Sequence, residues 1–547
     1  MRHEFLESFK SREEILEELI KKRKCEILVV GGGIHGAQFA RLASLNEFDT
    51  VLLERADYGG ATSSRSSKMA HGGLRYLEHL DLWQVLQGIK AREDLFITAP
   101  HFVKPYPFLI PVRKGSRLFG LKLKAGLFIY DLFNRDKLRK HKWLPASDSA
   151  NAVFADNSME LRGSLQFYDG IMNDVRLVHD YILSARQEGA LCLNYCGIEK
   201  IKPLKSGRIH VYFRDSISGS AGHIETGSVV NCAGPWVGDV AEMGGVTWIK
   251  ERVRYSQGIH LLFDVKWEHS ALLLPLEKKG RYYFVWPHFA GTLVGTTERE
   301  IVSLEDDPMP IKEEIELLLS RLDKDLPSAG LNRDTVHYCF AGVRVLPVLS
   351  NRDRSAPTDA LSRKHKWVFD AGILTLLGGK FTTASWTVRE GLKKLCKLAR
   401  IKDPIVSTKG RLLPGAASFK KTADDFIENI TGIGIDREVA EGAVLRFGSR
   451  VRYLYGDEAD EERSLTVLSN RLFLGELDMA IDIEQAEFLE DIMRRRLCFE
   501  YMSDHGFELL PDILSVLAEK KPGLDIGKEE KLYRERISAI KALLGKV

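Results

Sequence analysis

The part of this sequence with the clearest chemistry is a glycine-rich turn that could bind a diphosphate. It fits the pattern GxGxxG, in which the first glycine permits a tight turn, the second lets a pyrophosphate approach the backbone, and the third lets a helix pack closely on a strand. Free N–H groups at the start of that helix favour anions. We therefore expect contacts to a dinucleotide from Gly31, Gly32, Gly33, Ile34, His35 and Gly36.

A carboxylate and a hydroxyl-rich segment follow this turn. Glu54 stands 18 residues after Gly36, where it can accept hydrogen bonds from ribose hydroxyls of the dinucleotide. The glycine motif alone does not separate FAD from NAD. The next segments, residues 60–68 (GATSSRSSK) and 71–76 (HGGLRY), are dense in glycine and small hydroxyl residues. Such a composition suits the close approach of a large cofactor, so these segments favour FAD.

The elements expected around the turn form a strand–turn–helix–strand unit. Residues 26–30 (EILVV) are a short apolar run, which is typical of a buried parallel strand. Residues 37–45 are then expected to form a helix, and residues 50–53 (TVLL) a second strand. Ahead of this unit, residues 10–24 place apolar side chains on one helical stripe, which predicts a surface helix packed on the body.

Alternating strand and helix signals continue from about residue 150 to about residue 400. Residues 228–232 and 372–377 are apolar strands that run into glycine-containing segments, and residues 282–297 indicate two strands joined by a turn. Beyond residue 404 helical patterns dominate. The chain is therefore expected to have an α/β core followed by a mostly α-helical C-terminal domain, with helical patterns at 483–501 and 531–544. The expected divisions are an N-terminal helix (1–24), the core (25–400) and the C-terminal domain (401–547).

Composition excludes several classes of protein. The net charge of +3 on 547 residues is near neutral, and no nucleic-acid-binding motif accompanies the local basic charge, so we expect no nucleic-acid partner. Seven scattered cysteines do not resemble a disulfide framework and favour a reducing, cytoplasmic location. Cys192 and Cys196 lack a second pair that would complete a zinc site, so no metal is expected. We find neither a secretory signal nor an apolar run of the ~18 residues that a spanning helix needs.

Residues 113–142 concentrate positive charge around apolar side chains. They hold ten Lys and Arg residues against only Asp131 and Asp136, with leucines and phenylalanines in between. Basic residues around an apolar helix can bind anionic lipid in the plane of the membrane interface. The alternative is a core helix with a solvated basic face. In the first case the protein would be cytoplasmic with peripheral contact to the cytoplasmic membrane.

Beyond the glycine motif, the sequence resembles the FAD-dependent, aerobic-type glycerol-3-phosphate dehydrogenase family of the glycine/D-amino-acid oxidase superfamily. The matching runs are VVGGGIHGA, ATSSRSSKMAHGGLRYLEH, NCAGPWV, VGTTE, AGVRVL and GGKFTT, in the family's order from about residue 27 to about residue 385. Residues 413–415 (LPG) match the start of the family's helical C-terminal region. The second of these runs is much more specific than the glycine motif.

This resemblance implies a discontinuous FAD-binding domain of the Rossmann-like, glutathione-reductase type and a sheet-based substrate domain. It also implies oxidation of sn-glycerol 3-phosphate to dihydroxyacetone phosphate, with the electrons passing through FAD to a membrane quinone. Further FAD contacts are implied at Thr62, Ser63, Ser64, Ser67, His71, Gly72, Gly73, Gly378, Gly379, Lys380, Phe381 and Thr382.

Oxidation of a phosphorylated secondary alcohol needs positive charge to hold the phosphate. Arg75, Arg344 and Arg363 lie in motifs that match the family, and we expect them to bind the phosphate as a group, since arginine is the better bidentate ligand. Lys380, which follows two glycines, is expected to steady the negative charge of the flavin.

The reaction also needs a base for the hydroxyl proton. His260 matches the family's active-site histidine by its position within a strand, and its imidazole suits proton abstraction near neutral pH. The expected catalytic residues are thus His260, Arg344 and Lys380. Thr296 and Thr297 are expected to hydrogen-bond substrate oxygens, and Tyr76 is a second proton carrier beside Arg75.

The chain departs from the family at four positions near the expected site. His35, Glu298, Val345 and Ala384 stand where the family usually has Asn, Asp, Pro and Tyr. These differences leave a divergent dehydrogenase or a different substrate open, but they do not affect the prediction of FAD. Two alternatives remain: a flavin oxidase that uses oxygen, acting on glycerol 3-phosphate or on an amine or hydroxy acid, and a flavin-binding module without turnover. The sequence also leaves open the electron acceptor, covalent attachment of FAD, a homodimer and the role of residues 401–547.

Overall fold

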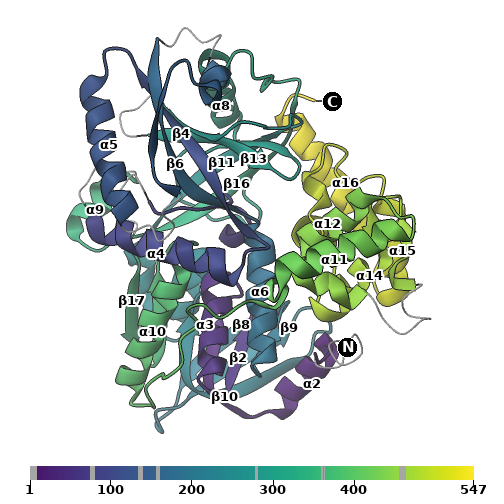
Figure 1. Ribbon diagram of the computed structural model, residues 1–547. Coiled ribbons are helices and arrows are strands. Elements are labelled where there is room, and N and C mark those ends of the chain that lie inside the picture. Colours follow the sequence, from purple (N-terminus) through teal and green to yellow (C-terminus); the bar gives the residue numbers. More distant parts are fainter. Residues whose placement is uncertain are drawn as a thin grey trace.

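A computed structural model describes residues 9–73, 81–132, 139–154, 160–276, 281–358, 361, 364–454 and 463–546 (Figure 1). Three of the predicted site residues, Arg75, Tyr76 and Arg363, lie outside the described residues.

The first sheet contains the strand–turn–helix–strand unit. Its strands lie in the order β17-β18-β10-β1-β2-β7, and β10 also pairs with β9, which pairs with β8. The five strands from β18 to β7 are parallel, as expected for strands buried on both faces. The bounds are β1 (Lys24–Val30), β2 (Thr50–Leu53), β7 (Leu191–Leu193), β8 (Cys196–Pro203), β9 (Ile209–Asp215), β10 (Ala221–Asn231), β17 (Lys366–Asp370) and β18 (Ile373–Leu377).

Helices cover both faces of this sheet. Helices α3, α6 and α10 pack together on one face, as Figure 1 shows in its lower half, and they share a core cluster with β1. A second cluster on the other face includes α2 and α7. The bounds are α2 (Arg12–Lys21), α3 (Ile34–Leu45), α6 (Asp174–Gln187), α7 (Val237–Met243) and α10 (Ala384–Ala399).

The second sheet forms the upper half of Figure 1 and is largely antiparallel. Its order is β15-β11-β14-β13-β12-β4-β6-β3, with β16 paired to β11 and β5 paired to β6. The strands are β3 (Met69–Ala70), β4 (Val103–Arg113), β5 (Lys142–Pro145), β6 (Leu161–Met172), β11 (Val253–Phe263), β12 (Ala271–Pro275), β13 (Tyr282–His288), β14 (Gly291–Gly295), β15 (Arg299–Ile301) and β16 (Val336–Pro347). The associated helices are α4 (Leu82–Thr98), α5 (Arg117–Leu132), α8 (Lys312–Asp325) and α9 (Asn351–Ser355).

The C-terminal region is mostly helical, and it packs beside both sheets in Figure 1. One large core cluster joins it to the second sheet. Its elements are α11 (Phe419–Gly432), α12 (Arg437–Phe447), α14 (Leu474–Asp478), α15 (Leu510–Lys520), α16 (Ile526–Leu543) and a small hairpin of β19 (Val467–Leu468) and β20 (Leu472–Phe473). The prediction of an α/β fold with a mostly helical C-terminal part is confirmed.

Residues 483–501 do not form the regular helix that their pattern suggested. Two π-helical segments, Met479–Ile483 and Asp491–Arg496, stand on either side of an irregular stretch, and Gln485 and Cys498 adopt left-handed backbone conformations. The stretch is apolar in pattern because nearly all of its residues are buried. However, its charged residues pair with distant parts of the chain, so a regular helix with one solvated face does not form.

Within the described ranges, we find no helix that combines the length and the apolar character needed to cross a membrane. No group of His, Cys, Asp and Glu in this part of the chain is arranged to hold a metal ion.

Candidate cofactor and substrate site

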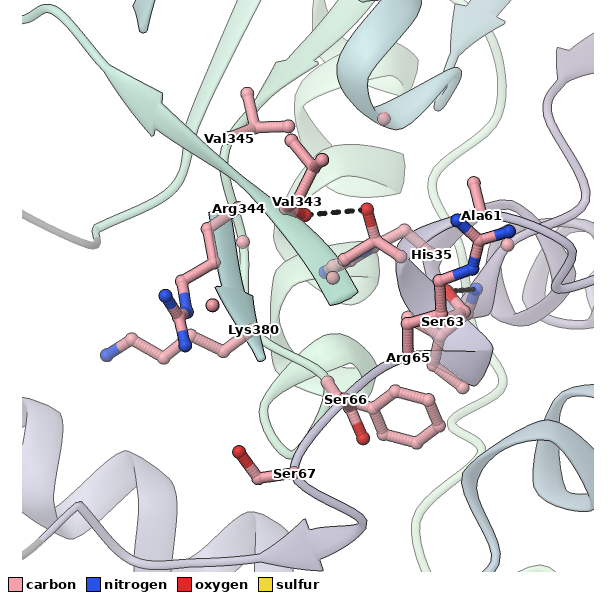
Figure 2. A pocket seen from close by; sticks show the side chains of 18 of the residues that line it. His35, Ala61, Ser63, Arg65, Ser66, Ser67, Val343, Arg344, Val345 and Lys380 are labelled. Carbon is pink, nitrogen blue, oxygen red and sulfur yellow. Dashed lines mark hydrogen bonds between the residues drawn. The ribbon is translucent and has the colours of Figure 1, made fainter. Parts of the chain in front are cut away.

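A cavity of about 1490 Å³ lies where the two sheets meet. Figure 2 shows part of its lining, with Arg344 and Lys380 on one side and Ser63 and Arg65 on the other. Most of the predicted site residues line it, although they come from segments far apart in the sequence: Gly31, Gly33, Ile34, His35, Glu54, Thr62, Ser63, Ser67, His71, Gly73, His260, Thr296, Thr297, Arg344, Gly378, Gly379, Lys380, Phe381 and Thr382.

Four residues predicted to contact the cofactor do not line the cavity and instead support the segments that line it: Gly32, Gly36, Ser64 and Gly72. A Cβ atom on Gly36 would lie 1.8 Å from the carbonyl oxygen of Gly31, so this glycine is needed for helix packing. The Gly32 N–H donates to the carboxylate of Glu54. The backbone N–H of Gly72 donates to Asp169 at 3.0 Å, and the Ser64 hydroxyl donates to a backbone carbonyl.

The turn between β1 and α3 forms an open cradle. Gly31 has φ of +101°, and a Cβ atom there would lie 2.6 Å from the carbonyl oxygen of Cys232. Two N–H groups of the turn are already paired: that of Gly32 donates to Glu54, and that of Ile34, at the first position of α3, donates to the Ser63 hydroxyl at 3.0 Å. Gly33, which lines the cavity at the start of α3, has no side chain to keep a phosphate away from the positive end of the helix dipole. The residues present therefore fit the diphosphate of a dinucleotide.

Glu54 lines the cavity and is the residue expected to bind the adenosine ribose. Its carboxylate accepts hydrogen bonds from the N–H groups of Gly32 at 2.6 Å and Ala56 at 2.9 Å. Burial raises its pKa above the ordinary value, although these two backbone donors act in the opposite direction. A carboxylate fixed at this end of β2 is suited to the ribose hydroxyls of a dinucleotide.

The loop after β18, which the resemblance places beside the flavin, also lines the cavity. Gly378 and Gly379 have φ of +70° and +120°, and a Cβ atom on Gly379 would lie 2.7 Å from the His35 ring. Lys380 follows them and donates to the side-chain oxygen of Gln84. The Thr382 hydroxyl accepts from the N–H of His71 at 3.3 Å, which joins two of the predicted cofactor segments.

Arg344 and the two threonines lie together on the second sheet. The guanidinium of Arg344 on β16 donates to the hydroxyl of Thr296 at 2.9 Å and to the carbonyl of Thr297 at 3.4 Å. The Thr297 hydroxyl already donates to Glu314 at 2.5 Å and accepts from the N–H of Ile259 at 3.1 Å. Thr297 thus holds the segment after β14 in place. The Thr296 hydroxyl and the Arg344 guanidinium are the polar groups offered to a ligand in the cavity.

His260 is buried on β11, the strand that pairs with β16. Its Nε2 lies 3.0 Å from the Ser67 hydroxyl, and its ring stacks on Phe340 with centroids 5.0 Å apart. Burial, with added repulsion from Arg344 and Lys68, holds the pKa of His260 well below the ordinary value of 6.5. The imidazole is therefore neutral at neutral pH, which is the form that a general base requires.

The four departures from the family do not all reach the cavity. His35, Glu298 and Val345 line it. Ala384 does not line it, because it is buried at the first position of α10. Val345 lies next to Arg344 on β16, so three of the four unusual residues are placed where they can affect a ligand.

The structure adds lining residues that the sequence interpretation did not select. Arg65 lies inside the SSRSSK run, so closer attention to that motif would have found it. Arg281 directly precedes β13 and belongs to no motif that we recognised. Arg495 comes from the C-terminal region, more than 400 residues after the cofactor turn, and no local sequence signal connects it to the site.

One side of the cavity is apolar. It lies between α5 and the second sheet, and both contribute large aliphatic and aromatic side chains to it: Phe108, Ile110, Leu123, Ile129, Phe167, Leu273, Leu276 and Phe284. This apolar chamber is continuous with the polar site and could accommodate a flat, hydrophobic ring.

Comparison with known proteins gives consistent sequence matches. Residues 26–376 match the family of FAD dependent oxidoreductases, and residues 406–522 match the C-terminal domain of alpha-glycerophosphate oxidase. A glycerol-3-phosphate dehydrogenase of Synechocystis sp. is 29% identical over 519 residues, which cover 91% of this chain and 93% of that protein. An aerobic glycerol-3-phosphate dehydrogenase of Staphylococcus aureus is 29% identical over 464 residues, which cover 82% of each.

Solved structures share the fold. The glycerol-3-phosphate dehydrogenase from Bacillus halodurans complexed with FAD aligns with a TM-score of 0.72 over 97% of both chains, at 22% identity. The L-alpha-glycerophosphate oxidase from Mycoplasma pneumoniae with FAD bound has a TM-score of 0.55 at 18% identity, and the match covers 72% of this chain and 99% of that one. The first family match spans well over half of the chain. The chain therefore belongs to the FAD-dependent oxidoreductase family, and its cofactor is FAD.

Proposed function

We propose that this protein oxidises sn-glycerol 3-phosphate to dihydroxyacetone phosphate and passes the electrons to a quinone. The observation that carries the proposal is the pairing of β11 and β16, which places the neutral base His260 and the cation Arg344 on adjacent strands facing one cavity. When bound, FAD supplies the hydride acceptor. The names of the curated relatives, both glycerol-3-phosphate dehydrogenases, support the same substrate.

Each polar residue then has a defined task. Arg344 binds the phosphate, with Arg75 and Arg363 expected to complete the anion site. His260 accepts the hydroxyl proton of the substrate through Nε2, which is the ring nitrogen beside Ser67. Thr296 positions a substrate oxygen, and Lys380 contributes positive charge at the flavin end.

Anaerobic reduction of the flavin tests the substrate directly. The purified yellow protein is freed of oxygen and mixed with sn-glycerol 3-phosphate, and the flavin absorbance is followed. We expect rapid bleaching with this substrate and none with glycerol or lactate, because only a phosphate engages the arginine site. A flavin that stays oxidised would contradict the proposed substrate. Rapid recovery of colour on adding a soluble quinone, without hydrogen peroxide on admitting air, would identify the acceptor.

The quinone and membrane proposals rest on the surface above the apolar chamber. Helix α5 exposes Leu121, Phe128 and Leu132 by 65%, 59% and 65%, and Trp83 at the start of α4 is also exposed. Lys124 on α5 is exposed as well, so the helix offers both apolar and basic groups. An apolar helix face with basic residues suits insertion at the surface of an anionic membrane. The chamber beneath α5 would then receive a quinone from that membrane.

We predict that Phe128→Glu weakens binding to vesicles of phosphatidylcholine and phosphatidylserine by about tenfold or more, because a charged residue replaces apolar area that would enter the interface. Cosedimentation measures this binding. Leu532→Glu is the matched control, since Leu532 is a similarly exposed residue on α16. Equal binding by the two variants would contradict docking through α5. Wild-type binding to pure phosphatidylcholine that is as strong as binding to the mixed vesicles would contradict docking on an anionic membrane.

A further inference from the structure

Three consecutive arginines of the C-terminal region lead to the cofactor cavity. Arg494, Arg495 and Arg496 end the π-helical segment Asp491–Arg496, and all three are buried. Segments with π-helical geometry are frequent at functional sites. In this chain the irregular segment reaches three different loops, which contain Asp57, Tyr195 and Asp307. Each of these three residues lines the cavity.

The first of these loops follows Glu54. Asp57 lies three residues after Glu54. Its carboxylate accepts a hydrogen bond from Arg495 at 2.6 Å and one from each terminal nitrogen of Arg496, at 2.6 and 2.8 Å. Burial alone would raise the pKa of Asp57, but Arg496 and Arg495 hold it below the ordinary value, so the carboxylate is ionised. Asp57 and Arg495 both line the cavity beside Glu54.

The second loop joins β7 to β8. Tyr195 in this loop lines the cavity, and its hydroxyl donates to Asp491 at 2.7 Å. Arg495 donates to the same carboxylate oxygen, so Asp491 links Tyr195 to the arginine that holds Asp57. The two loops are thereby fixed relative to each other by side chains of the C-terminal region.

The third loop follows β15. Asp307 lines the cavity and accepts from Arg494 at 3.3 Å, and it also pairs with Arg536 of α16. On the cavity side it pairs at 2.7 Å with Arg65, which belongs to the hydroxyl-rich cofactor segment. One carboxylate therefore connects the cofactor segment to two elements of the C-terminal region.

We propose that residues 490–496 act as a clasp for FAD. By binding Asp57, Tyr195 and Asp307, they hold the three loops closed around the adenosine end of the cofactor. Arg494 and Arg495 are positioning residues in this device. The proposal gives a role to the C-terminal helices and rests on FAD binding, which family membership shows, and not on the identity of the substrate.

Opening the clasp would break buried ion pairs. Glu54 and the glycine cradle are fixed by β1, β2 and α3, independently of the C-terminal region. Release of a dinucleotide requires the surrounding loops to separate. Moving the Asp57 loop away from residues 490–496 separates a buried carboxylate from both arginines that pair with it, Arg495 and Arg496, which is strongly unfavourable. The clasp therefore acts mainly on the rate of FAD release and has little effect on the structure of the sheet that binds FAD.

The test is the rate of FAD release from the holoenzyme. Purified protein is diluted into buffer, and the rise in fluorescence of free FAD is recorded. We expect Arg495→Lys to release FAD about tenfold faster or more, because lysine keeps the charge but loses the planar fork that bridges three carboxylates, those of Asp57, Glu490 and Asp491. Asp307→Asn, which neutralises a carboxylate that is 38% exposed, is also expected to raise the rate of release.

Arg446→Lys is the matched control, because Arg446 makes a similarly buried two-point pair with Glu476 inside the C-terminal region and does not line the cavity. It is expected to lower the melting temperature while leaving the rate of FAD release unchanged. Release at the wild-type rate from both Arg495→Lys and Asp307→Asn would overturn the clasp, as would equal acceleration in Arg446→Lys. If Arg495→Lys does not fold, Asp307→Asn alone decides.

Discussion

Arg344→Met is expected to lower kcat/KM for sn-glycerol 3-phosphate by about 30- to 5000-fold. Loss of one partner from a hydrogen-bonded charge pair costs about 2–5 kcal/mol, and every ~1.4 kcal/mol corresponds to a factor of ten in rate. Arg344 lines the cavity, and its guanidinium is aimed by Thr296 and Thr297. Because phosphate binding persists from the ground state into the transition state, we expect the loss to fall more on KM than on kcat.

Steady-state kinetics with a soluble quinone acceptor measure this effect. Arg344→Lys should lie between the wild type and Arg344→Met, because lysine restores the charge without the bidentate geometry. Arg254→Met is the control: Arg254 lies on the neighbouring strand β11, pairs with Glu300 and does not line the cavity. If Arg254→Met and Arg344→Met lose similar amounts of kcat/KM, Arg344 has no special part in binding the phosphate.

The cofactor half of the site could be predicted because its determinants are local. The helix after Gly33 and the strand that ends before Glu54 lie within one short stretch of chain, and their apolar patterns and glycine spacing predict the unit that forms. The expected strand at 50–53 coincides with β2, and the expected helix at 37–45 lies within α3. Local patterns succeed where neighbours in sequence are also neighbours in the fold.

The rest of the site depends on contacts between distant segments. Gly72 was expected to touch the cofactor, but its N–H is taken by Asp169, almost 100 residues away. Arg495 and Asp57 are separated by 438 positions, and nothing in the pattern of either segment predicts their pairing. The same buried charges explain why residues 483–501 look helical in sequence and yet form an irregular segment. Such pairs are visible only once the fold has assembled them.

His260→Asn is expected to lower kcat by about 100- to 10,000-fold, the usual contribution of a positioned general base, with a much smaller change in KM. Asparagine preserves the polar character and approximate size of the side chain but cannot accept the substrate proton. His35→Asn provides the control. His35 is half-buried and also lines the cavity, and asparagine is the residue that resembling proteins usually carry there. We expect its kcat to stay within about threefold of the wild type.

The pH dependence of kcat/KM separates a base from a merely structural histidine. A base must be unprotonated, and the acid limb of the profile reports its pKa in the free enzyme. Burial, with Arg344 and Lys68, lowers the pKa of His260, so the wild-type limb should lie well below pH 6.5 and kcat/KM should be flat just above that pH. Arg344→Met removes one of these positive charges, so the pKa should rise and the limb should move towards pH 6.5. If the limb keeps its position in Arg344→Met and persists unchanged in His260→Asn, the titrating base is another residue.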